Sequence, residues 1–515
     1  MTKKMSRRRE RRARPAVAKS PLAHIPWLKI QNGMTPITRL DAEAEEKIHE
    51  ASMRILEEIG LAFMDDEGLE LWAAVGAKVD RKKQHLWLDR DLVLDLVSKA
   101  PAQFTWRARN PNRHVTIGGN HIAFVPQGGV VFVHDLDQGR RPGQLVDYHN
   151  FLKLVQMCNA LHFAGEQIIV PHDVPVSYRH LERLLGSFTL SDKACLEAAH
   201  GRVITNDAIE MAKIVFGNDI ADSNEPVIGG IINASSPLRY DDRMVGGMIA
   251  YARANQVTVI TPFILAGAMS PITMAGAVAQ QNAEALAGIA FTQLVRPGAP
   301  VIYGGFATNI DMQSGAPAFG TPEGAWAAIA GAQLARRYGL PYRNSGTMNT
   351  SNVPDAQGAY ETMWAIWPAI LAHSNFIMHS VGWLEGGLVV GYEKMMIDME
   401  NLAMFQHFFQ DVEVSDETLA LDMIAEVGPG GHHLGTPHTQ ARFRTEFYQP
   451  FLADRQNYES WVQSGVGDTA TRANKVWKEV LNSYERPPID EGINEALNAY
   501  VERRKAELKG VDLYT

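Results

Sequence analysis

From about residue 147 onward, short apolar runs alternate with amphipathic segments of helical period. The runs have the composition of buried strands, and the segments between them are typical of helices of about 10 to 20 residues. This alternation predicts a parallel sheet covered by helices, and about seven or eight such units favour closure into a (β/α)8 TIM barrel. An open, doubly wound sheet is the alternative. The predicted strands lie near residues 163–170, 194–199, 226–233, 257–265, 299–306, 341–343 and 375–381.

The first 150 residues follow a different pattern. Apolar residues recur at helical spacing from Asp41 to Gly60, which predicts a helix that ends at a glycine cap. Residues 92–97 predict a second helix, and 104–133 predict β hairpins with turns at 110–112 and 118–120. We therefore expect four regions: a disordered basic tail over 1–30, an N-terminal α+β segment over 31–150, the barrel over 151–440 and a C-terminal helical extension over 441–515.

Polar residues gather directly after the predicted strands, which is where barrel enzymes build their active sites. We expect these groups to converge on one mouth of the barrel. They are Glu166, Gln167, His172 and Asp173; Asn233 and Ser235; Thr308, Asn309 and Asp311; residues 344–352; and His379, Trp383 and Glu385.

The stretch 343–361 is the most informative of these groups. Its small and polar residues at 344–349 are not expected to continue a buried strand, and would leave hydrogen-bond donors near solvent or a ligand. Pro354 and Asp355 then open a helix that carries Tyr360. We interpret the stretch as strand, functional loop and helix. The alternative is an ordinary connection whose Ser and Asn residues only cap the helix.

Two neighbouring loops carry candidate ligand contacts. Asn309 and Asp311 stand among small residues and could bind polar atoms of a ligand, although local Asx-turns would also explain them. Trp383 and Glu385 combine an aromatic ring with a carboxylate beside flexible glycines, which favours a cation pocket. Packing of a lid is the alternative for these aromatic residues.

Three histidines, His432, His433 and His438, occupy a glycine-rich turn. They suggest zinc, but the chain has no His-Glu-x-x-His motif and no cysteine nearby, so we expect no metal centre. The turn also suits the docking of a large planar partner. Neither a Gly-x-Gly-x-x-Gly fingerprint nor a Gly-x-Ser-x-Gly elbow is present, which argues against a nucleotide cofactor and a serine triad.

Composition and charge narrow the class further. The 515 residues are 46% hydrophobic and 21% charged, as in an ordinary enzyme with a large core. The net charge of −9 gives no general attraction to nucleic acid or to an anionic membrane. Because no signal peptide or apolar run of about 18 residues occurs, we expect a cytoplasmic protein. We also expect a homo-oligomer, with Cys158 and Cys195 as reduced core thiols.

Four runs resemble the trimethylamine:corrinoid methyltransferase family, and the similarity covers roughly residues 30–500. The resemblance implies a (β/α)8 barrel that transfers a methyl group from a methylated amine to the cobalt(I) of a corrinoid (cobalamin) carried by a separate, cognate protein. It also implies that His432, His433 and His438 dock that corrinoid protein. The runs that carry it span 304–323, 354–361, 382–387 and 428–439.

One departure from the family bears on the substrate. The archaeal trimethylamine enzymes carry pyrrolysine in the corresponding loop, whereas residues 347–352 here are all standard. Members without pyrrolysine include glycine betaine methyltransferases. Because a quaternary nitrogen leaves as a neutral tertiary amine, its methyl group is already activated. We therefore expect a quaternary, glycine betaine-like donor. Trimethylamine or another methylamine as donor, or a relative that only binds quaternary amines, are the alternatives.

The candidate roles follow from this interpretation. Arg343 could hold a betaine carboxylate with its forked donors, or could merely brace Glu361 or Glu385. The catalytic candidates are Glu385, Asn352 and Asp355, and the substrate-binding candidates are Trp383, Tyr360, Phe306, Arg343, Asn309, Asp311, His379 and Glu166.

Overall fold

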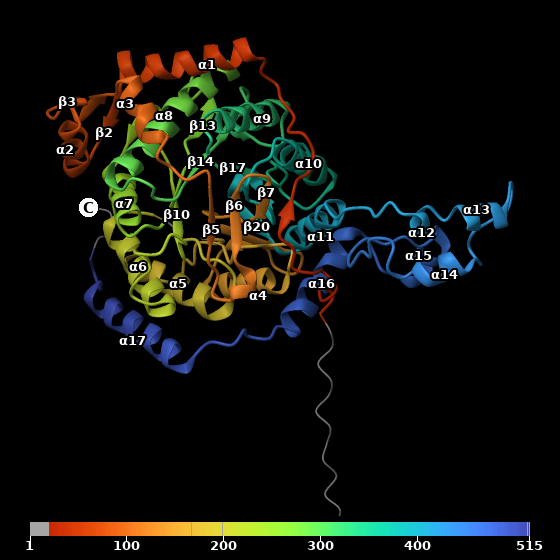
Figure 1. Ribbon diagram of the computed structural model, residues 1–515. Helices are drawn as coiled ribbons and strands as arrows, with labels where there is room; N and C mark the ends of the chain where they lie inside the picture. The colour runs from red at the N-terminus through yellow and green to blue at the C-terminus, as the bar shows by residue number, and fades with distance from the viewer. Residues whose placement is uncertain (1–19, 166, 198, 512, 514–515) are drawn as a thin grey trace, which may run out of the picture.

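The computed structural model describes residues 20–165, 167–197, 199–511 and 513. Helices surround a central group of strands, and one part of the chain projects away from this body as an arm (Figure 1). The candidate Glu166 lies outside the described residues. Both cysteines are buried and free, as expected.

The main sheet has seven strands, of which six run parallel and only the edge strand β1 is antiparallel. This confirms the α/β class. β7 lies before residue 151, so the sheet also uses residues from the expected N-terminal segment. In spatial order the strands are β1 (Ile30–Gln31), β7 (His121–Phe124), β18 (Phe376–Met378), β17 (Tyr342–Ser345), β14 (Val301–Gly304), β12 (Val257–Ile260) and β10 (Gly229–Ile232).

Two short extended segments, 162–164 and 194–197, link the two ends of this row of parallel strands. Main-chain hydrogen bonds run from β7 to the first segment, from the first to the second, and from the second to β10. The three bonds, each 2.9 Å long, are His162 N to Phe124 O, Ala164 N to Ala194 O and Glu197 N to Gly229 O. The segments coincide with two of the predicted strands, which are much shorter than expected.

Helices follow most of the parallel strands and pack around them (Figure 1). The helix expected after the functional loop is confirmed, because Asp355 caps α10 by accepting from the Gly358 N–H at 3.0 Å. The Thr321-Pro322-Glu323 start of α9 is also as expected. The helices are α4 (Leu145–Met157), α5 (Arg179–Leu190), α6 (Arg202–Phe216), α7 (Asp242–Arg253), α8 (Met274–Val295), α9 (Pro322–Arg337), α10 (Ala356–Leu371) and α11 (Tyr392–Phe408).

After β1, the N-terminal part continues with α1 (Ala42–Arg54), which is capped by Asp41 and runs through a π-helical turn, η1 (Ile55–Ile59), to Gly60. Its predicted extent is therefore confirmed. The predicted hairpin at 110–112 is also present, because β5 (Gln103–Trp106) pairs with β6 (Val115–Gly118). The second predicted hairpin is wrong, since β7 leaves β6 after the turn and pairs with β1 and β18.

The remaining strands form small sheets at the margins of the main one. A short π or 3-10 turn interrupts the chain at several other points. The further elements before the arm are β2 (Leu61–Phe63), α2 (Asp66–Ala74), β3 (Lys78–Asp80), β4 (His85–Trp87), α3 (Arg90–Val97), η2 (Pro111–Arg113), β8 (Phe132–Asp135), β9 (Gly139–Pro142), η3 (Val176–Tyr178), β11 (Arg239–Tyr240), β13 (Phe263–Ala266), β15 (Phe306–Ile310), β16 (Pro317–Ala318), β19 (Trp383–Leu384), η4 (Glu385–Gly387) and β20 (Val389–Gly391).

The chain after α11 is entirely helical and irregular in its described part. The arm carries α12 (Asp416–Leu419), α13 (Leu421–Val427), α14 (Pro437–Arg442) and α15 (Tyr458–Ser464), and the chain then returns to the body as α16 (Thr469–Asn482) and α17 (Glu491–Glu507) (Figure 1). Within the described residues, we find no helix that combines the length and the apolar character needed to cross a membrane.

Candidate functional site

The carboxyl ends of three adjacent parallel strands bring several of the predicted residues together. Arg343 lies within β17, which ends at Ser345, and His379 directly follows β18. Phe306 starts β15, two residues after β14 ends. Trp383 starts β19, four residues after His379. The site is therefore assembled from segments that the parallel sheet aligns at one edge.

Five rings form a continuous group, which we call the aromatic cluster: Phe263, Phe306, Phe319, His379 and Trp383. The Phe306 ring lies 4.8 Å from Phe263, 5.8 Å from Phe319 and 5.4 Å from His379, measured between ring centres. The Trp383 ring lies 4.6 Å from His379 and packs edge-to-face on Phe319 at 5.4 Å. Trp383 is only 5% exposed. The cluster offers the negative faces of several rings in a dry setting.

Arg343 lies against this cluster and is buried. Its guanidinium carbon is 5.0 Å from the centre of the Phe306 ring. Its Nη1 donates to the Gly305 main-chain oxygen at 3.1 Å, and its Nη2 contacts the Met378 sulfur at 3.5 Å. Glu361 accepts from Thr350, and Glu385 from Arg140, so each of the two proposed carboxylate partners of Arg343 has a hydrogen-bond donor elsewhere.

His379 links the cluster to β17. Its Nδ1 lies 2.9 Å from the Ser345 hydroxyl, and its backbone has a positive φ of 54°. Burial, and secondly the positive charge of Arg343, hold the pKa of His379 well below its ordinary value. The imidazole is therefore neutral at neutral pH and does not repel a cation in the cluster.

The polar stretch after β17 is buried, which corrects one expectation. Asn344 and Ser345 do continue a buried strand, because both pair with β18, and the Ser345 N–H donates to the Asn344 side-chain oxygen at 2.8 Å. β14 pairs only with the first two residues of β17. Further along, Asn349 and Trp383 exchange hydrogen bonds: the Trp383 indole N–H donates to the Asn349 main-chain oxygen at 3.1 Å, and the Asn349 amide donates to the Trp383 carbonyl. The loop and the Trp383 segment are thus held together.

A buried ion pair supports this arrangement from α11. Lys394 Nζ lies 2.5 Å from Asp398 Oδ1 and donates to the Thr362 hydroxyl at 2.9 Å. The other oxygen of Asp398 accepts from the Gly382 N–H at 2.7 Å, directly before Trp383. Burial lowers the pKa of Lys394. The pair therefore fixes the main chain that presents the Trp383 ring.

Glu385 lies near the cluster, but its charge already has a partner. The Nε of Arg140 donates to both of its carboxylate oxygens at 2.9 and 3.0 Å, and the Glu385 main-chain N–H donates to Ser351. The Arg140 guanidinium also covers the Phe132 ring at 3.7 Å. Because the Arg140 side chain is 42% exposed, solvent and salt screen this ion pair.

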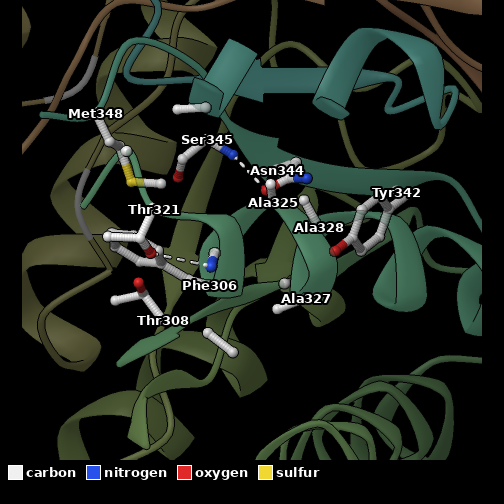
Figure 2. A pocket seen from close by; sticks show the side chains of 15 residues that line it. Phe306, Thr308, Thr321, Ala325, Ala327, Ala328, Tyr342, Asn344, Ser345 and Met348 are labelled. Carbon is white, nitrogen blue, oxygen red and sulfur yellow. Dashed lines mark hydrogen bonds between the residues drawn. The ribbon is translucent and has the colours of Figure 1, made fainter. Parts of the chain in front are cut away.

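A small cavity adjoins the cluster through Phe306. Side chains from β15, the start of α9, β17 and the following loop surround it, and Met348 and Thr321 lie on the same side as Phe306 (Figure 2). Its volume is about 20 Å³, which is room for about one water molecule. A quaternary amine would therefore need this region to open.

Two buried amides lie at the same edge: Gln127, which the sequence did not predict, and Asn344, which belongs to the predicted polar stretch. Gln127 follows β7 and is fully buried, yet neither of its side-chain polar atoms has a hydrogen-bond partner among the described residues. The Nδ2 of Asn344 is likewise buried without such a partner among the described residues. Buried amides usually need a partner, so these groups point to a ligand or water. The signal for Gln127 was a glutamine directly after an apolar run, within the segment interpreted as hairpins.

The other predicted residues lie apart from the cluster. Tyr360 is 57% exposed on the surface of α10, and Asn352 is exposed in the preceding loop. Asp355 is exposed and serves as the cap of α10. Asp311 closes a local turn by accepting from Ser314.

Asn309 accepts from the Thr321 hydroxyl at 3.1 Å and so helps to hold the start of α9. His432 and His433 are exposed and His438 is partly exposed, all on the arm between α13 and α14 or at the start of α14. The structure therefore brings together Phe306, Arg343, His379 and Trp383, with Glu385 beside them.

Comparison with known proteins identifies relatives along almost the whole chain. The profile of the family described as Trimethylamine methyltransferase (MTTB) matches residues 4–509. Glycine betaine methyltransferase from Desulfitobacterium hafniense (strain Y51) is 39% identical over 469 residues, which cover 91% of this chain and 97% of that protein. Trimethylamine methyltransferase MttB from D. hafniense (strain DSM 10664 / DCB-2) is 30% identical, and the match covers 89% of this chain and 92% of that protein. The crystal structure of the Methanosarcina barkeri monomethylamine methyltransferase (MtmB) matches with a TM-score of 0.50 and 9% identity, over 92% of this chain and 89% of that chain.

Proposed function

Because this chain belongs to the trimethylamine methyltransferase (MTTB) family, we propose that it transfers a methyl group from a glycine betaine-like quaternary amine to the cobalt(I) of a corrinoid protein. The chain is a methyltransferase, as its relatives are. The observation that carries the substrate class is the buried aromatic cluster with the Arg343 guanidinium beside it. It combines a surface for a trimethylammonium group with a donor for a carboxylate.

The fold that we propose is a closed (β/α)8 barrel. Its eight extended segments are the six parallel strands of the main sheet together with residues 162–164 and 194–197. The main-chain hydrogen bonds that run from β7 through these two segments to β10 support closure. The aromatic cluster then lies at the carboxyl-terminal mouth, where barrel enzymes bind their substrates. The division at residues 30, 150 and 440 stays a prediction.

The proposed wall for the cation consists of Trp383 and Phe306, with Phe319 behind them. A quaternary ammonium group has no N–H to donate, so it is held by ring faces and by the exclusion of water. A neutral His379 suits this site because a second positive charge would repel the substrate. Tyr360 also stays a predicted wall residue, although its exposed position requires that it act from the surface.

Arg343 is the proposed contact for the carboxylate of a betaine. Its guanidinium is fixed by Gly305 and by stacking on Phe306, so little side-chain freedom is lost when it binds. Gln127 and Asn344, whose amide N–H groups need acceptors, could add donors to the same carboxylate. Together these groups would point the trimethylammonium end toward the aromatic cluster.

Glu385 is proposed as a nearby counter-charge for the cation. Its ion pair with Arg140 would moderate this effect. The other predicted contacts, Asn352 and Asp355 as catalytic residues and Asn309, Asp311 and Glu166 as substrate ligands, stay predictions.

The methyl acceptor is proposed to be a corrinoid that belongs to a partner protein, and it is therefore a substrate of this chain. When bound, its reduced cobalt supplies the nucleophile. This chain would hold the methyl donor in line, exclude water and release the demethylated tertiary amine, which needs no proton donor. His432, His433 and His438 stay the predicted contacts for the corrinoid protein.

The test is a methyl-transfer assay with cobalt(I) cobalamin and a panel of glycine betaine, choline, carnitine and trimethylamine. We expect glycine betaine to be converted to dimethylglycine, and Trp383→Ala to lose most of this activity. A strong preference for trimethylamine would overturn the proposed substrate class. Binding of glycine betaine without any demethylated product would favour a relative that only binds quaternary amines.

A further inference from the structure

The arm, residues 410–465, has almost no interior of its own. It leaves the body after α11, carries four short helices and returns to α16 (Figure 1). All of its residues are described, and Leu452 alone among them is buried. At its base, Glu400 of α11 accepts from the main-chain N–H groups of Phe451 and Leu452. Beyond this base the arm makes its turns and caps locally.

The helices of the arm are nevertheless well formed. Ser415 caps α12, Thr436 caps α14 and Asn457 caps α15, each by accepting a main-chain N–H from three residues later. Helices of four to seven residues are not stable in water by themselves, since most helical stability comes from packing of an apolar face. These helices therefore lack the packed apolar face on which most helical stability depends.

The arm also carries a dense set of exposed apolar side chains. Val412 is 85% exposed and Leu434 is 83% exposed, which is unusual for residues within an ordered segment. So many exposed large apolar side chains within 51 residues favour a protein–protein interface. The exposed apolar residues are Val412, Val414, Leu419, Leu421, Ile424, Leu434, Phe443, Phe447, Tyr458, Trp461 and Val462.

Within residues 411–445 of the arm, charge distinguishes an acidic half from a basic half, whereas residues 446–465, which carry Glu446, Asp454, Arg455 and Glu459, belong to neither. Residues 411–426 carry six carboxylates and no Lys or Arg, whereas residues 427–445 carry Arg442, Arg444 and three histidines but no carboxylate. Arg442 pairs with Glu417 inside the arm, which shows that the two halves are mutually attractive. In a two-fold symmetric contact, the first half of one arm faces the second half of the other, and both attractions are made twice.

We propose that the arm packs against the arm of a second copy of this chain around a two-fold axis. The apolar side chains of the two arms cover one another, and the acidic half of each arm lies against the basic half of its partner. The inference is independent of the methyl-transfer reaction, because it rests on the arm alone. It assigns a specific surface to the expected homo-oligomer.

This contact and the predicted docking of the corrinoid protein at His432, His433 and His438 compete for the same part of the arm, and a second copy suits it better than the corrinoid protein does. A partner that delivers and removes methyl groups must dissociate in each cycle, and would leave the apolar residues exposed each time. An identical copy is present at all times and at the same concentration. Self-complementary charge is also a property of an isologous contact, and a different protein has no need of it.

The test combines light scattering with two charge-reversal variants of the full chain. One variant carries Glu413→Lys and Glu426→Lys in the acidic half, and the other carries Arg442→Glu and Arg444→Glu in the basic half. We expect the wild type to have a mass of at least two chains, and each variant to have half of that mass, with the dimer weakened at least tenfold. Mixing the two variants should restore the full mass, because opposite charges then meet at both contacts: the introduced Lys residues face the introduced Glu residues at one, and the native Glu residues face the native Arg residues at the other.

Two further variants test the apolar part of the contact and provide a control. Leu421→Ser with Ile424→Ser should halve the mass without charge effects, whereas Val146→Asp, which changes an exposed apolar residue of α4, should leave it unchanged. The thermal unfolding of the body, followed by circular dichroism, identifies any variant that fails to fold. A monomeric wild type, reversed variants that keep the full mass, or mixtures that fail to recover it would each overturn the proposal. If only addition of the corrinoid protein orders the arm, the occupant is that protein.

Discussion

The indole N–H of Trp383 donates to the main-chain oxygen of Asn349 at 3.1 Å, and the Asn349 side chain returns a hydrogen bond to the Trp383 carbonyl. The place of the ring therefore depends on the loop after β17. Asn349→Ala leaves a buried carbonyl without its donor, which costs about 1 to 3 kcal/mol. We expect a lower melting temperature and roughly tenfold weaker binding of glycine betaine, measured by calorimetry. Val353→Ala, which changes an exposed side chain of the same loop, is the matched control.

The aromatic wall and the guanidinium should affect different parts of the substrate. Trp383→Ala should weaken the binding of glycine betaine and of choline alike, by about 1 to 2 kcal/mol, because both carry the same cation. Arg343→Ala should weaken only glycine betaine, which has the carboxylate. Binding titrations of both ligands to both variants measure this, with the exposed aromatic Phe408→Ala as control. If both variants bind both ligands normally, the assignment of this pocket is wrong.

Substitutions of Arg140 and of Glu385, which form an ion pair, should change the affinity for quaternary amines in opposite directions. Glu385→Gln removes a negative charge near the cluster and should weaken the binding of every quaternary amine in the panel. Arg140→Gln frees the same carboxylate and should strengthen the binding of these amines. Because Arg140 is partly exposed, both effects should shrink as the salt concentration rises. A titration series over salt separates them from structural damage, which would weaken binding in both variants at every salt concentration.

Acid should destabilise the protein through His162. Its Nδ1 accepts from the Phe124 N–H at 3.0 Å, so the proton is on Nε2, which donates to the Leu28 oxygen at 3.1 Å. Burial lowers the pKa of His162 to about 4, whereas an unfolded histidine has a pKa of about 6.5. The unfolded state therefore binds a proton first as the pH falls, and stability is lost between about pH 6.5 and 4.

Through His162, the free energy of unfolding should fall by about 1.4 kcal/mol for each pH unit in this range. Thermal unfolding over that range measures it. In His162→Gln the slope should be smaller by this amount, whereas in the control His433→Gln, at an exposed position of the arm, it should match the wild type. Equal slopes in all three proteins would show that His162 titrates normally.

Replacing Lys394 alone should lower the free energy of unfolding much more than replacing both Lys394 and Asp398. Lys394→Met leaves the Asp398 charge buried without its cation, which costs about 3 to 5 kcal/mol. The double variant Lys394→Met with Asp398→Asn removes that charge and should recover much of the stability. Chemical denaturation measures both variants. A double variant that is no more stable than the single one would show that the contact with Gly382, and not the charge, matters most.

The sequence predicted the elements whose signals are local. The helix from Asp41, the Thr321-Pro322-Glu323 cap and the alternation of apolar strands with helices all depend on neighbouring residues, and all are confirmed. Arg343, Phe306, His379 and Trp383 were found because each stands at the end of an apolar run. The parallel sheet then brings such positions together.

What could not be predicted depends on pairing over long distances. The residues 344–345 are polar, yet their pairing with β18 makes a buried strand of them. β7 has the pattern of a hairpin strand, and only its partner β18 shows that it belongs to the main sheet. Gln127 was missed for the same reason. Tyr360 was included because helical spacing alone does not say which face of α10 is buried.

The pairing of β7 with β18 also has a consequence for biosynthesis. Beside it, the Asn375 amide donates to the main-chain oxygen of Gly119, 256 residues earlier in the chain. At about 5 to 20 residues per second, this distance corresponds to roughly ten to fifty seconds of translation. During that time β7 lacks its parallel neighbour and presents an open strand edge to other nascent chains. The protein is therefore expected to depend on chaperones until residue 378 has left the ribosome, and truncations before that point should aggregate.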